Sequence, residues 1–427
     1  MHIDKTVAES AARDWMQAAA ARARAASGVL ATLPEAARNL ALRAAARAIR
    51  ADAAAIEAAN ARDLAAFDAG GGTKAFRDRL ALNPARIAAM AQGLDDIAAL
   101  PDPLARTLAE WTRPNGLRIR RIPQPLGVIG MIYESRPNVG ADAAGLCLKA
   151  GNAVILRGGS DSFHSAAAIH AAVSAGLREA GAPEAAVQIP PATDRAYVAA
   201  MLGAAGQIDL IIPRGGTSLV ERVQAEARVP VLAHAEGLCH TYIHAEADPA
   251  MARAILANAK LRRTGVCGAT ETLLIDAAIA PSLLPLLIGD LRAQGCAFRA
   301  DARARAIVPD LPAANDADFD TEWLDAVLSV AVVDGVDAAI AHILRHGSEH
   351  TEAIVTRDEA AAERFMRGLS SAVVMWNAST QFCDGGEFGF GAEIGIATGR
   401  MHARGPIGLE QLTTFRYLVL GHGQVRP

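Results

Sequence analysis

Cys267 stands in a short segment, residues 262–268, whose composition suits a reactive thiol. Glycine and other small residues flank it, so a backbone N–H there is free to point at whatever the sulfur attacks. Arg262 and Arg263 come shortly before it, and nearby positive charge favours the thiolate over the thiol. The apolar pattern predicts a helix over residues 249–261 and a strand over residues 271–276. Cys267 is therefore expected in the turn between them, as a candidate nucleophile.

The other cysteines set the alternative to this hypothesis. The chain has five cysteines, an odd number, with wide spacings and no Cys-x-x-Cys pair, so a disulfide framework and a structural zinc site are both disfavoured. A lone cysteine in an apolar protein is usually buried and inert. We expect four of the five to be unreactive residues of this kind: Cys147, Cys239, Cys296 and Cys383. His346 and His350 lack a third ligand nearby in the sequence, and no metal site is predicted.

Three further segments offer groups that stabilise anions. Asn138 follows an apolar run at residues 127–132, where its amide is placed to donate to an oxyanion. The predicted strand at residues 153–156 is followed by a basic residue and then by glycines. The predicted strand at residues 208–212 is likewise followed by a basic residue and then by glycines. A basic, glycine-rich loop at the carboxyl end of a parallel strand is a reasonable place to hold a nucleotide phosphate.

The elements that must position these residues alternate in a regular way. Residues 5–100 show helical periodicity, broken at residues 70–72 and at Pro84. Asn115-Gly116 then predicts a hairpin turn before a half-exposed strand at residues 117–123. Strands and helices alternate from there to about residue 232 and again from residue 249. This spacing predicts a doubly wound parallel sheet in each half. The strands expected beyond those already named are residues 229–232, 327–333, 353–356, 373–375 and the extended stretch 413–420.

Composition excludes several classes of function. With 52% hydrophobic and 21% charged residues over 427 positions, the chain is expected to fold into two or three domains. A net charge of −4 and 4% aromatic residues argue against nucleic acid and anionic membranes as partners. The first residues do not look like a secretory signal, and the longest apolar run, residues 279–288, contains two prolines and is too short to span a bilayer. A soluble, cytoplasmic protein is predicted.

The order of these segments resembles the aldehyde dehydrogenase superfamily over nearly the whole chain. Within it, the sequence is similar to the members that reduce L-glutamyl 5-phosphate with NADPH in proline biosynthesis. The blocks that carry this similarity are residues 133–139, 233–240, 384–389, 391–395 and 402–409.

The resemblance implies a role for each candidate residue. Cys267 is the nucleophile that forms a thioester, and Asn138 is the oxyanion donor. The implied product is L-glutamate 5-semialdehyde, with release of phosphate. The implied cofactor-binding residues are Arg157, Gly158, Gly159, Ser160, Arg214, Gly215, Gly216, Thr217 and Glu322. The implied substrate-binding residues are Ser135, Arg136, His234 and Arg404, with Lys149 as a further candidate cation; for each cation a structural ion pair is the alternative.

Four details refine this expectation. NADPH is favoured over NADH because Arg157 is basic and position 160 is serine, where relatives that use NAD have a glutamate; Asp161, one residue along, argues the other way. His234 stands where hydrolytic relatives have a water-activating glutamate, which favours phosphate over water. Gly268 departs from the asparagine that many members have after the cysteine.

The implied fold has three parts, with an NADPH-binding domain (residues 1–106 and 124–245), a catalytic domain (residues 246–380) and an oligomerisation flap (residues 107–123 and 400–427). The exposed strands of the flap predict a homo-oligomer. A glutamate kinase that supplies the unstable acyl phosphate is the protein partner that the resemblance suggests. Two other functions stay open: a hydrolytic or CoA-acylating aldehyde dehydrogenase, and a non-catalytic binding protein on the same fold.

Overall fold

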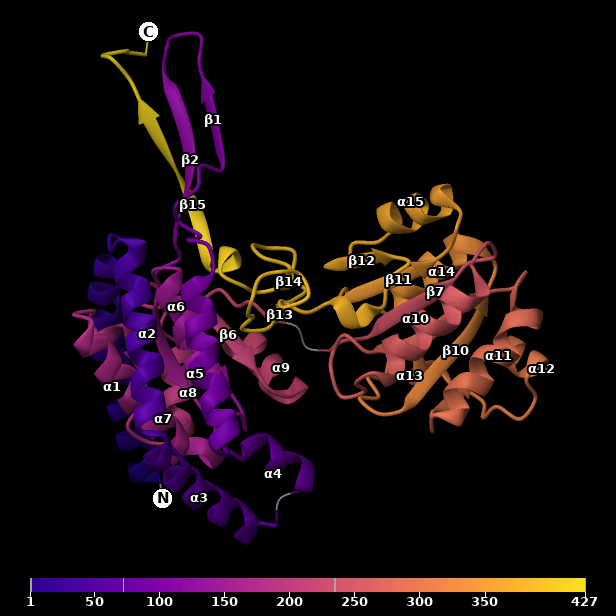
Figure 1. Cartoon of the computed structure of the whole chain (residues 1–427), viewed down its shortest axis with the longest axis horizontal. Coiled ribbons are helices and arrows are strands. Elements are labelled where there is room, and N and C mark those ends of the chain that lie inside the picture. The colour runs from indigo at the N-terminus through magenta and orange to yellow at the C-terminus, as the bar shows by residue number, and fades with distance from the viewer. Residues whose placement is uncertain (1, 72, 234–235, 427) are drawn as a thin grey trace. The chain divides into compact units, whose positions relative to one another are not determined.

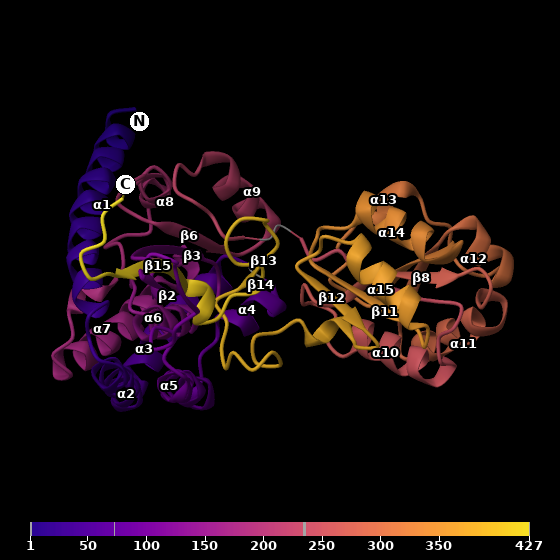
Figure 2. The same cartoon turned by 90° about the horizontal axis from the view of Figure 1, so that it is seen from above.

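The computed structural model describes residues 2–71, 73–233 and 236–426. The chain divides into two compact units, shown in Figures 1 and 2. Unit 1 comprises residues 1–233, 389–395 and 407–427, and unit 2 comprises residues 234–388 and 396–406. Unit 1 is therefore assembled from both ends of the sequence, and the roles predicted for the domains remain predictions. No helix in the described ranges is long and apolar enough to cross a membrane.

Unit 1 is built on a parallel sheet of order β5-β4-β3-β6 within the described residues. Helices α6 and α7 connect β3 to β4 and β4 to β5, so right-handed crossovers place both on one face. The step from β5 to β6 runs in the opposite direction, and α8 therefore covers the other face together with α1. The strands of unit 1 are β1 (Ala109–Thr112), β2 (Arg118–Pro125), β3 (Val128–Tyr133), β4 (Ala153–Arg157), β5 (Val187–Gln188), β6 (Leu210–Arg214) and β15 (Thr413–Leu420).

The start of helix α5 shows how the local sequence sets a helix end in unit 1. Helix α5 starts at Pro84, where the missing N–H costs nothing, and the Asn83 side chain accepts from the Arg86 N–H. The α-helices of unit 1 are α1 (His2–Leu30), α2 (Glu35–Ala51), α3 (Ala53–Ala69), α4 (Lys74–Leu80), α5 (Pro84–Ala99), α6 (Val139–Lys149), α7 (Phe163–Glu179), α8 (Arg195–Leu202) and α9 (Thr217–Glu226). Its short 3-10 helices are η1 (Ser160–Ser162), η2 (Glu184–Ala186) and η4 (Glu410–Leu412).

A second sheet of unit 1, of order β1-β2-β15, projects from the helical body (Figure 1). The predicted turn at Asn115-Gly116 joins β1 to β2 in antiparallel register, and Gly116 has a φ of +85°. Strand β15 pairs with β2 along its whole length, from Thr413 opposite Pro125 to Leu420 opposite Arg118. The C-terminal strand thus completes a sheet that begins near residue 109.

Unit 2 contains a parallel sheet of order β12-β11-β7-β8-β10-β9 in the described part of the chain. Helices α10 and α11 pack on one face, and α13, α14 and α15 on the other. The strands are β7 (Cys239–Ile243), β8 (Thr270–Asp276), β9 (Ala297–Ala300), β10 (Val327–Val333), β11 (Thr351–Val355), β12 (Val373–Trp376), β13 (Ile396–Ala397) and β14 (Gly405–Pro406). The helices are α10 (Pro249–Leu261), α11 (Ala280–Ala293), α12 (Ala302–Ile307), α13 (Asp316–Phe319), α14 (Gly335–His346), α15 (Glu359–Gly368) and η3 (Thr380–Phe382).

These two sheets confirm the predicted fold class, two doubly wound α/β units with an added antiparallel flap. One local expectation was wrong, and one buried strand was missed. The strand expected over residues 229–232 is a single bridge between Val231 and Ile211. Strand β7, by contrast, was not predicted, because Cys239, His240 and Thr241 interrupt its apolar pattern although all of its residues are buried.

Candidate active site

Cys267 lies in the predicted turn between α10 and β8 of unit 2. It is partly exposed, whereas the other four cysteines are buried. Burial raises the pKa of Cys147 and Cys239, so those thiols stay protonated and inert. Cys267 is therefore the most exposed of the five cysteines.

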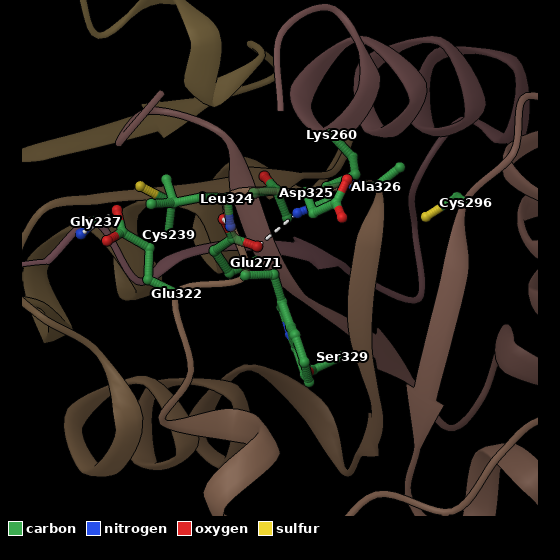
Figure 3. A network of polar contacts seen from close by, with 12 residues as sticks. Gly237, Cys239, Lys260, Glu271, Cys296, Glu322, Leu324, Asp325, Ala326 and Ser329 are labelled. Atoms are coloured by element: carbon green, nitrogen blue, oxygen red, sulfur yellow. Dashed lines mark hydrogen bonds and ion pairs between the residues drawn. The ribbon is translucent and has the colours of Figure 1, made fainter. Parts of the chain in front are cut away.

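Residues about 30 positions earlier in the sequence contact the backbone of Cys267 and restrict its position. A Cβ on Gly237 would lie 2.2 Å from the Cys267 carbonyl oxygen and 2.6 Å from its Cα, so only glycine fits there. The Cys239 thiol donates to the same carbonyl oxygen, with 3.0 Å between Sγ and O. The Gly237 N–H in turn donates to Glu322 Oε1 at 2.9 Å, as Figure 3 shows. These contacts fix the backbone position of Cys267.

Glu322 makes a structural contact besides the predicted contact with a cofactor ribose. Burial raises the pKa of its carboxyl group, while the hydrogen bond from Gly237 opposes that rise. The side chain therefore anchors the glycine on which Cys267 rests. The ribose contact remains a prediction.

Gly268 and the segment before Cys267 are also constrained. A Cβ at position 268 would lie 3.2 Å from the Thr380 carbonyl oxygen, so a side chain there requires the η3 segment to shift. Buried Gln381, from the same segment, donates through Nε2 to the carbonyls of Ala259 and Arg263. The end of α10 is thus tied to η3. Arg262 and Arg263 are exposed, and their effect on the thiol remains a prediction.

A buried ion pair lies in the same network and was not predicted. Lys260 Nζ is 2.5 Å from Glu271 Oε2, and both side chains are almost completely buried (Figure 3). Burial raises the pKa of Glu271 to about 7, against the lowering effect of Lys260. Glu271 Oε1 also accepts from the Leu324 N–H at 3.3 Å. The sequence did contain a signal for this ion pair. Lys260 is one of four lysines in the chain and lies on an apolar helix face.

In unit 1, Asn138 occupies the N-cap position of α6 but its side chain does not cap the helix. Its Nδ2 instead donates to Asp142 Oδ2 at 3.1 Å, one turn along the helix. The two side chains line a cavity of about 80 Å³ with Arg136, Arg214 and Glu393. Burial raises the pKa of Asp142 to about 6, while Asn138 and Arg214 oppose that rise. Asp142 was not predicted as a site residue, although its i+4 spacing from Asn138 places both on one helix face.

The glycine loop after β4 is held by two side chains. The Arg157 guanidinium donates to the carbonyls of Gly158 and Thr193, at 2.5 and 2.8 Å. Burial lowers the pKa of Arg157. The Ser135 hydroxyl donates to Asp161, and Ser135 has a left-handed φ of +46°. Asp161, which argued against NADPH in the sequence, is thus engaged by a side chain of the same unit.

The loop after β6 already binds an anionic group. The Gly216 N–H, just before α9, donates to Glu134 Oε2 at 3.0 Å. A Cβ on Gly215 would lie 2.3 Å from the same oxygen. The helix start therefore donates an N–H to a carboxylate oxygen, and a phosphate oxygen is able to accept the same bond. The Arg214 guanidinium donates to the Ile394 carbonyl at 2.9 Å.

The predicted cations have different surroundings. Lys149 is fully buried and lies 2.7 Å from Glu35 Oε1, which is the structural alternative for this residue. Arg404 Nη2 lies 3.2 Å from Glu349 Oε2 in unit 2, and Arg400 contacts the same carboxylate. Arg136 lines the cavity beside Asn138. His234 lies outside the described residues.

The structure thus gathers the predicted residues in two places. Asn138, Arg136 and Arg214 share one cavity of unit 1, and Cys267 lies against Gly237 in unit 2 with Glu322 one contact away. The pairing of Asn138 with Cys267 joins the two units and remains a prediction.

Comparison with known proteins gives consistent matches. The model of the aldehyde dehydrogenase family matches residues 4–294. The gamma-glutamyl phosphate reductase of Acidiphilium cryptum is 74% identical over 412 residues, covering 96% of this chain and 97% of the relative. That of Gluconobacter oxydans is 71% identical over 407 residues, covering 95% of each.

Solved structures agree. The crystal structure of gamma-glutamyl phosphate reductase from Thermotoga maritima matches with a TM-score of 0.95 and 40% identity, over 96% of this chain and 100% of that one. An acetylating aldehyde dehydrogenase from Geobacillus thermoglucosidasius matches with a TM-score of 0.68 at 17% identity, over 98% and 99% of the two chains, which is a likeness of fold.

Proposed function

The chain belongs to the aldehyde dehydrogenase family, among the gamma-glutamyl phosphate reductases, and from this premise we propose that it reduces L-glutamyl 5-phosphate to L-glutamate 5-semialdehyde and phosphate. The observation that carries the proposal is Cys267, a partly exposed thiol whose backbone is fixed by Gly237 and Cys239. This step belongs to proline biosynthesis from glutamate.

The reaction uses Cys267 first as nucleophile and then as leaving group. Its thiolate attacks the acyl carbon, a C–S bond forms, and the C–O bond to phosphate breaks, so phosphate departs with the electron pair. The Cys267 N–H and the Asn138 amide donate to the oxyanion, and each such donor contributes about 3–4 kcal/mol in comparable sites. After reduction of the thioester, the C–S bond breaks, and the semialdehyde leaves with Cys267 again a thiolate.

The cofactor is a nicotinamide nucleotide, and we propose NADPH. When bound, it supplies the hydride. The fit rests on the Gly216 N–H, which donates to the Glu134 carboxylate, and on the basic residue at the end of β4. The residues proposed to hold it are Arg157, Gly158, Gly159, Ser160, Arg214, Gly215, Gly216, Thr217 and Glu322.

We propose that the α-carboxylate and the phosphate of the substrate are held by cations and polar groups from both units: Ser135, Arg136, His234 and Arg404. We also propose a homo-oligomer. Large apolar side chains on β1 and β15 are exposed, which an assembly of copies would cover: Trp111, Phe415, Tyr417, Val419 and Leu420. We further propose a cytoplasmic location and an association with a glutamate kinase, because an acyl phosphate that is unstable in water is used best close to the enzyme that makes it.

Phosphate dependence of the reverse reaction is the decisive test. With the semialdehyde and NADP⁺, reduction of NADP⁺ is expected only when phosphate or arsenate is present, because one of these must attack the thioester. Turnover without either would indicate a hydrolytic enzyme, and turnover with CoA in their place an acylating one.

Cys267→Ala separates catalysis from binding. We expect no measurable turnover and unchanged NADPH binding, with Cys296→Ala as the control because Cys296 is buried and serves no proposed step. Unchanged activity of Cys267→Ala would remove the nucleophile assignment. Absence of turnover in the wild type with intact NADPH binding would favour the non-catalytic alternative.

A further inference from the structure

Asn138 is placed where an asparagine normally caps its own helix, yet it does not do so. Asparagine at an N-cap usually accepts a hydrogen bond from a backbone N–H of the first turn. Here the side chain makes no capping bond, and Nδ2 donates to Asp142 Oδ2 at 3.1 Å. The amide is therefore oriented by a carboxylate one helical turn away.

The consequence follows from what each group can donate and accept. An ionised carboxylate only accepts, so it must face the NH₂ end of the Asn138 amide and not the oxygen end. One N–H is then bound to Asp142, and the second points away from it. A protonated carboxyl group is able to donate to the amide oxygen instead, which turns the NH₂ end elsewhere. The charge on Asp142 thus selects the orientation of Asn138.

The surroundings of Asp142 place this contact at a built site. The cavity of about 80 Å³ is large enough to admit a small polar group, and its charged lining comes from separate segments: Arg136 before α6, Arg214 at the end of β6 and Glu393 from residues 389–395. Helix α5 meets Asp142 at Gly93 and places no charge at that contact, since an added Cβ there would lie 3.7 Å from Oδ1.

We propose that Asp142 is a positioning residue of the reaction, which holds the Asn138 amide so that its second N–H faces the developing oxyanion. The proposal rests on the proposed function, in which Asn138 is the oxyanion donor. Asp142 itself touches no reacting atom. A neutral side chain at this position would not enforce one orientation of the amide.

Asp142→Asn tests the proposal, since it keeps the size of the side chain and removes its charge. We expect kcat to fall about 10–100-fold with little change in KM, because orientation is lost in the transition state. The acid side of the wild-type pH profile, with an apparent pKa near that of Asp142, should disappear in the variant. Asp95→Asn on α5, which removes a carboxylate from a partly exposed ion pair of the same unit, should change neither quantity.

A double-mutant cycle separates positioning from a structural role. Asn138→Ala should lower kcat about 10²–10³-fold, and the double variant with Asp142→Asn should be no slower than Asn138→Ala alone. Additive losses, or an Asp142→Asn variant with unchanged kcat while Asn138→Ala is impaired, would overturn the proposal for Asp142. Full activity of Asn138→Ala would instead overturn the oxyanion assignment.

Stability supplies the remaining control. The pKa of Asp142 is raised in the folded protein, so ionisation of this group disfavours folding near neutral pH, and Asp142→Asn should unfold at the same temperature as the wild type or higher. A loss of activity that came with a lower unfolding temperature would indicate a structural role and contradict the proposal.

Discussion

The parallel sheets of the two units bury different kinds of side chain. In unit 1, β3 and β4 are aliphatic along most of their length, and their polar residues, Tyr133 and Arg157, stand at the carboxyl ends. In unit 2, β7 and β8 carry buried polar and charged residues in their interiors: His240, Thr241, Thr270, Glu271 and Thr272.

The difference follows from what each sheet supports. The loops after the unit 1 strands bring backbone amides and a few cations to the sheet edge, which suits an anionic nucleotide. The unit 2 strands lie next to the Cys267 turn, and their buried polar side chains have partners in neighbouring elements: Glu271 with Lys260, and His240 Nδ1 with Glu352 Oε2 at 2.9 Å. Altering the glycine loops of unit 1 should therefore weaken cofactor binding, whereas altering the buried ion pairs of unit 2 should weaken the fold.

The largest effect on stability is expected at the Lys260–Glu271 pair. Lys260→Met leaves a carboxyl group buried without its cation, which costs about 3–5 kcal/mol of unfolding free energy. Because the pKa of Glu271 lies near 7, the deficit should be larger at pH 8 than at pH 6. Hydrogen exchange of peptides from β7 and β8 measures this loss of unfolding free energy locally.

The matched control for that pair is an exposed one in the same unit. Arg303 Nη2 lies 2.7 Å from Asp334 Oδ1, with side-chain exposures of 47% and 74%. Arg303→Met should cost less than about 1 kcal/mol. Equal losses in the two variants would remove the distinction between buried and exposed charge on which the comparison depends.

Gly237→Ala should give the next largest effect, on catalysis. The added Cβ would force the Cys267 backbone to move, and a displacement of about 1 Å in a reacting group lowers the rate about 100-fold. We expect reduced kcat and slower alkylation of Cys267, with NADPH binding unchanged. Gly265→Ala is the control, because its Cβ would have only the Leu324 carbonyl near it, at 3.9 Å. Normal kcat in Gly237→Ala would show that this glycine does not position the nucleophile.

Arg157→Ala tests the unit 1 side of the comparison. If the guanidinium binds the 2′-phosphate, the KM for NADPH should rise about 10–100-fold and that for NADH should not change, since a charged hydrogen bond contributes about 1.5–3 kcal/mol. If it acts only through the Gly158 and Thr193 carbonyls, both cofactors should be affected equally. Steady-state kinetics with each nucleotide separates the two outcomes.

The smallest effects are opposite pH dependences in the two units. Burial lowers the pKa of His342, in α14, to about 3, so the folded state resists a proton that the unfolded state takes up below about pH 6.5. Relative to His342→Gln, the wild type should lose at most about 1.4 kcal/mol per pH unit as the pH falls from 6.5 to 5.

The effect of Asp142, in unit 1, on stability changes with pH in the opposite direction. Its raised pKa means that, relative to Asp142→Asn, the wild type should lose stability as the pH rises from about 4 to 6. Unfolding measured against pH for the two variant pairs checks both slopes. If stability changed with pH in the same direction for both pairs, the buried environments assigned to His342 and Asp142 would be contradicted.

Sequence reasoning succeeded where a local pattern determines the structure. Continuous apolar runs predicted β3 and β4, and Asn115-Gly116 predicted the β1–β2 turn. It failed at β7, whose polar side chains are satisfied by residues far along the chain: Thr241 by Thr270 and Tyr242 by Asp276. No local pattern contains such partners.

The same division holds for the candidate site. The small and basic neighbours of Cys267 made it a candidate, and the resemblance to a family assigned its role. The contacts of Gly237 and Cys239 with Cys267 were not predictable from spacing, because they depend on how β7 lies beside β8. Asp142 could have been predicted from the sequence, since Asn138 lies one helical turn before it.

The pairing of β15 with β2 has a consequence for synthesis on the ribosome. Pro125 is made long before Thr413, its partner in the sheet, and at about 5–20 residues per second the interval is roughly 15–60 s. Throughout that time one edge of β2 has no partner strand, while the whole of unit 2 emerges and is able to fold. An unpaired strand edge is a template for wrong pairing. The nascent chain should therefore depend most on chaperones just before its last residues leave the exit tunnel.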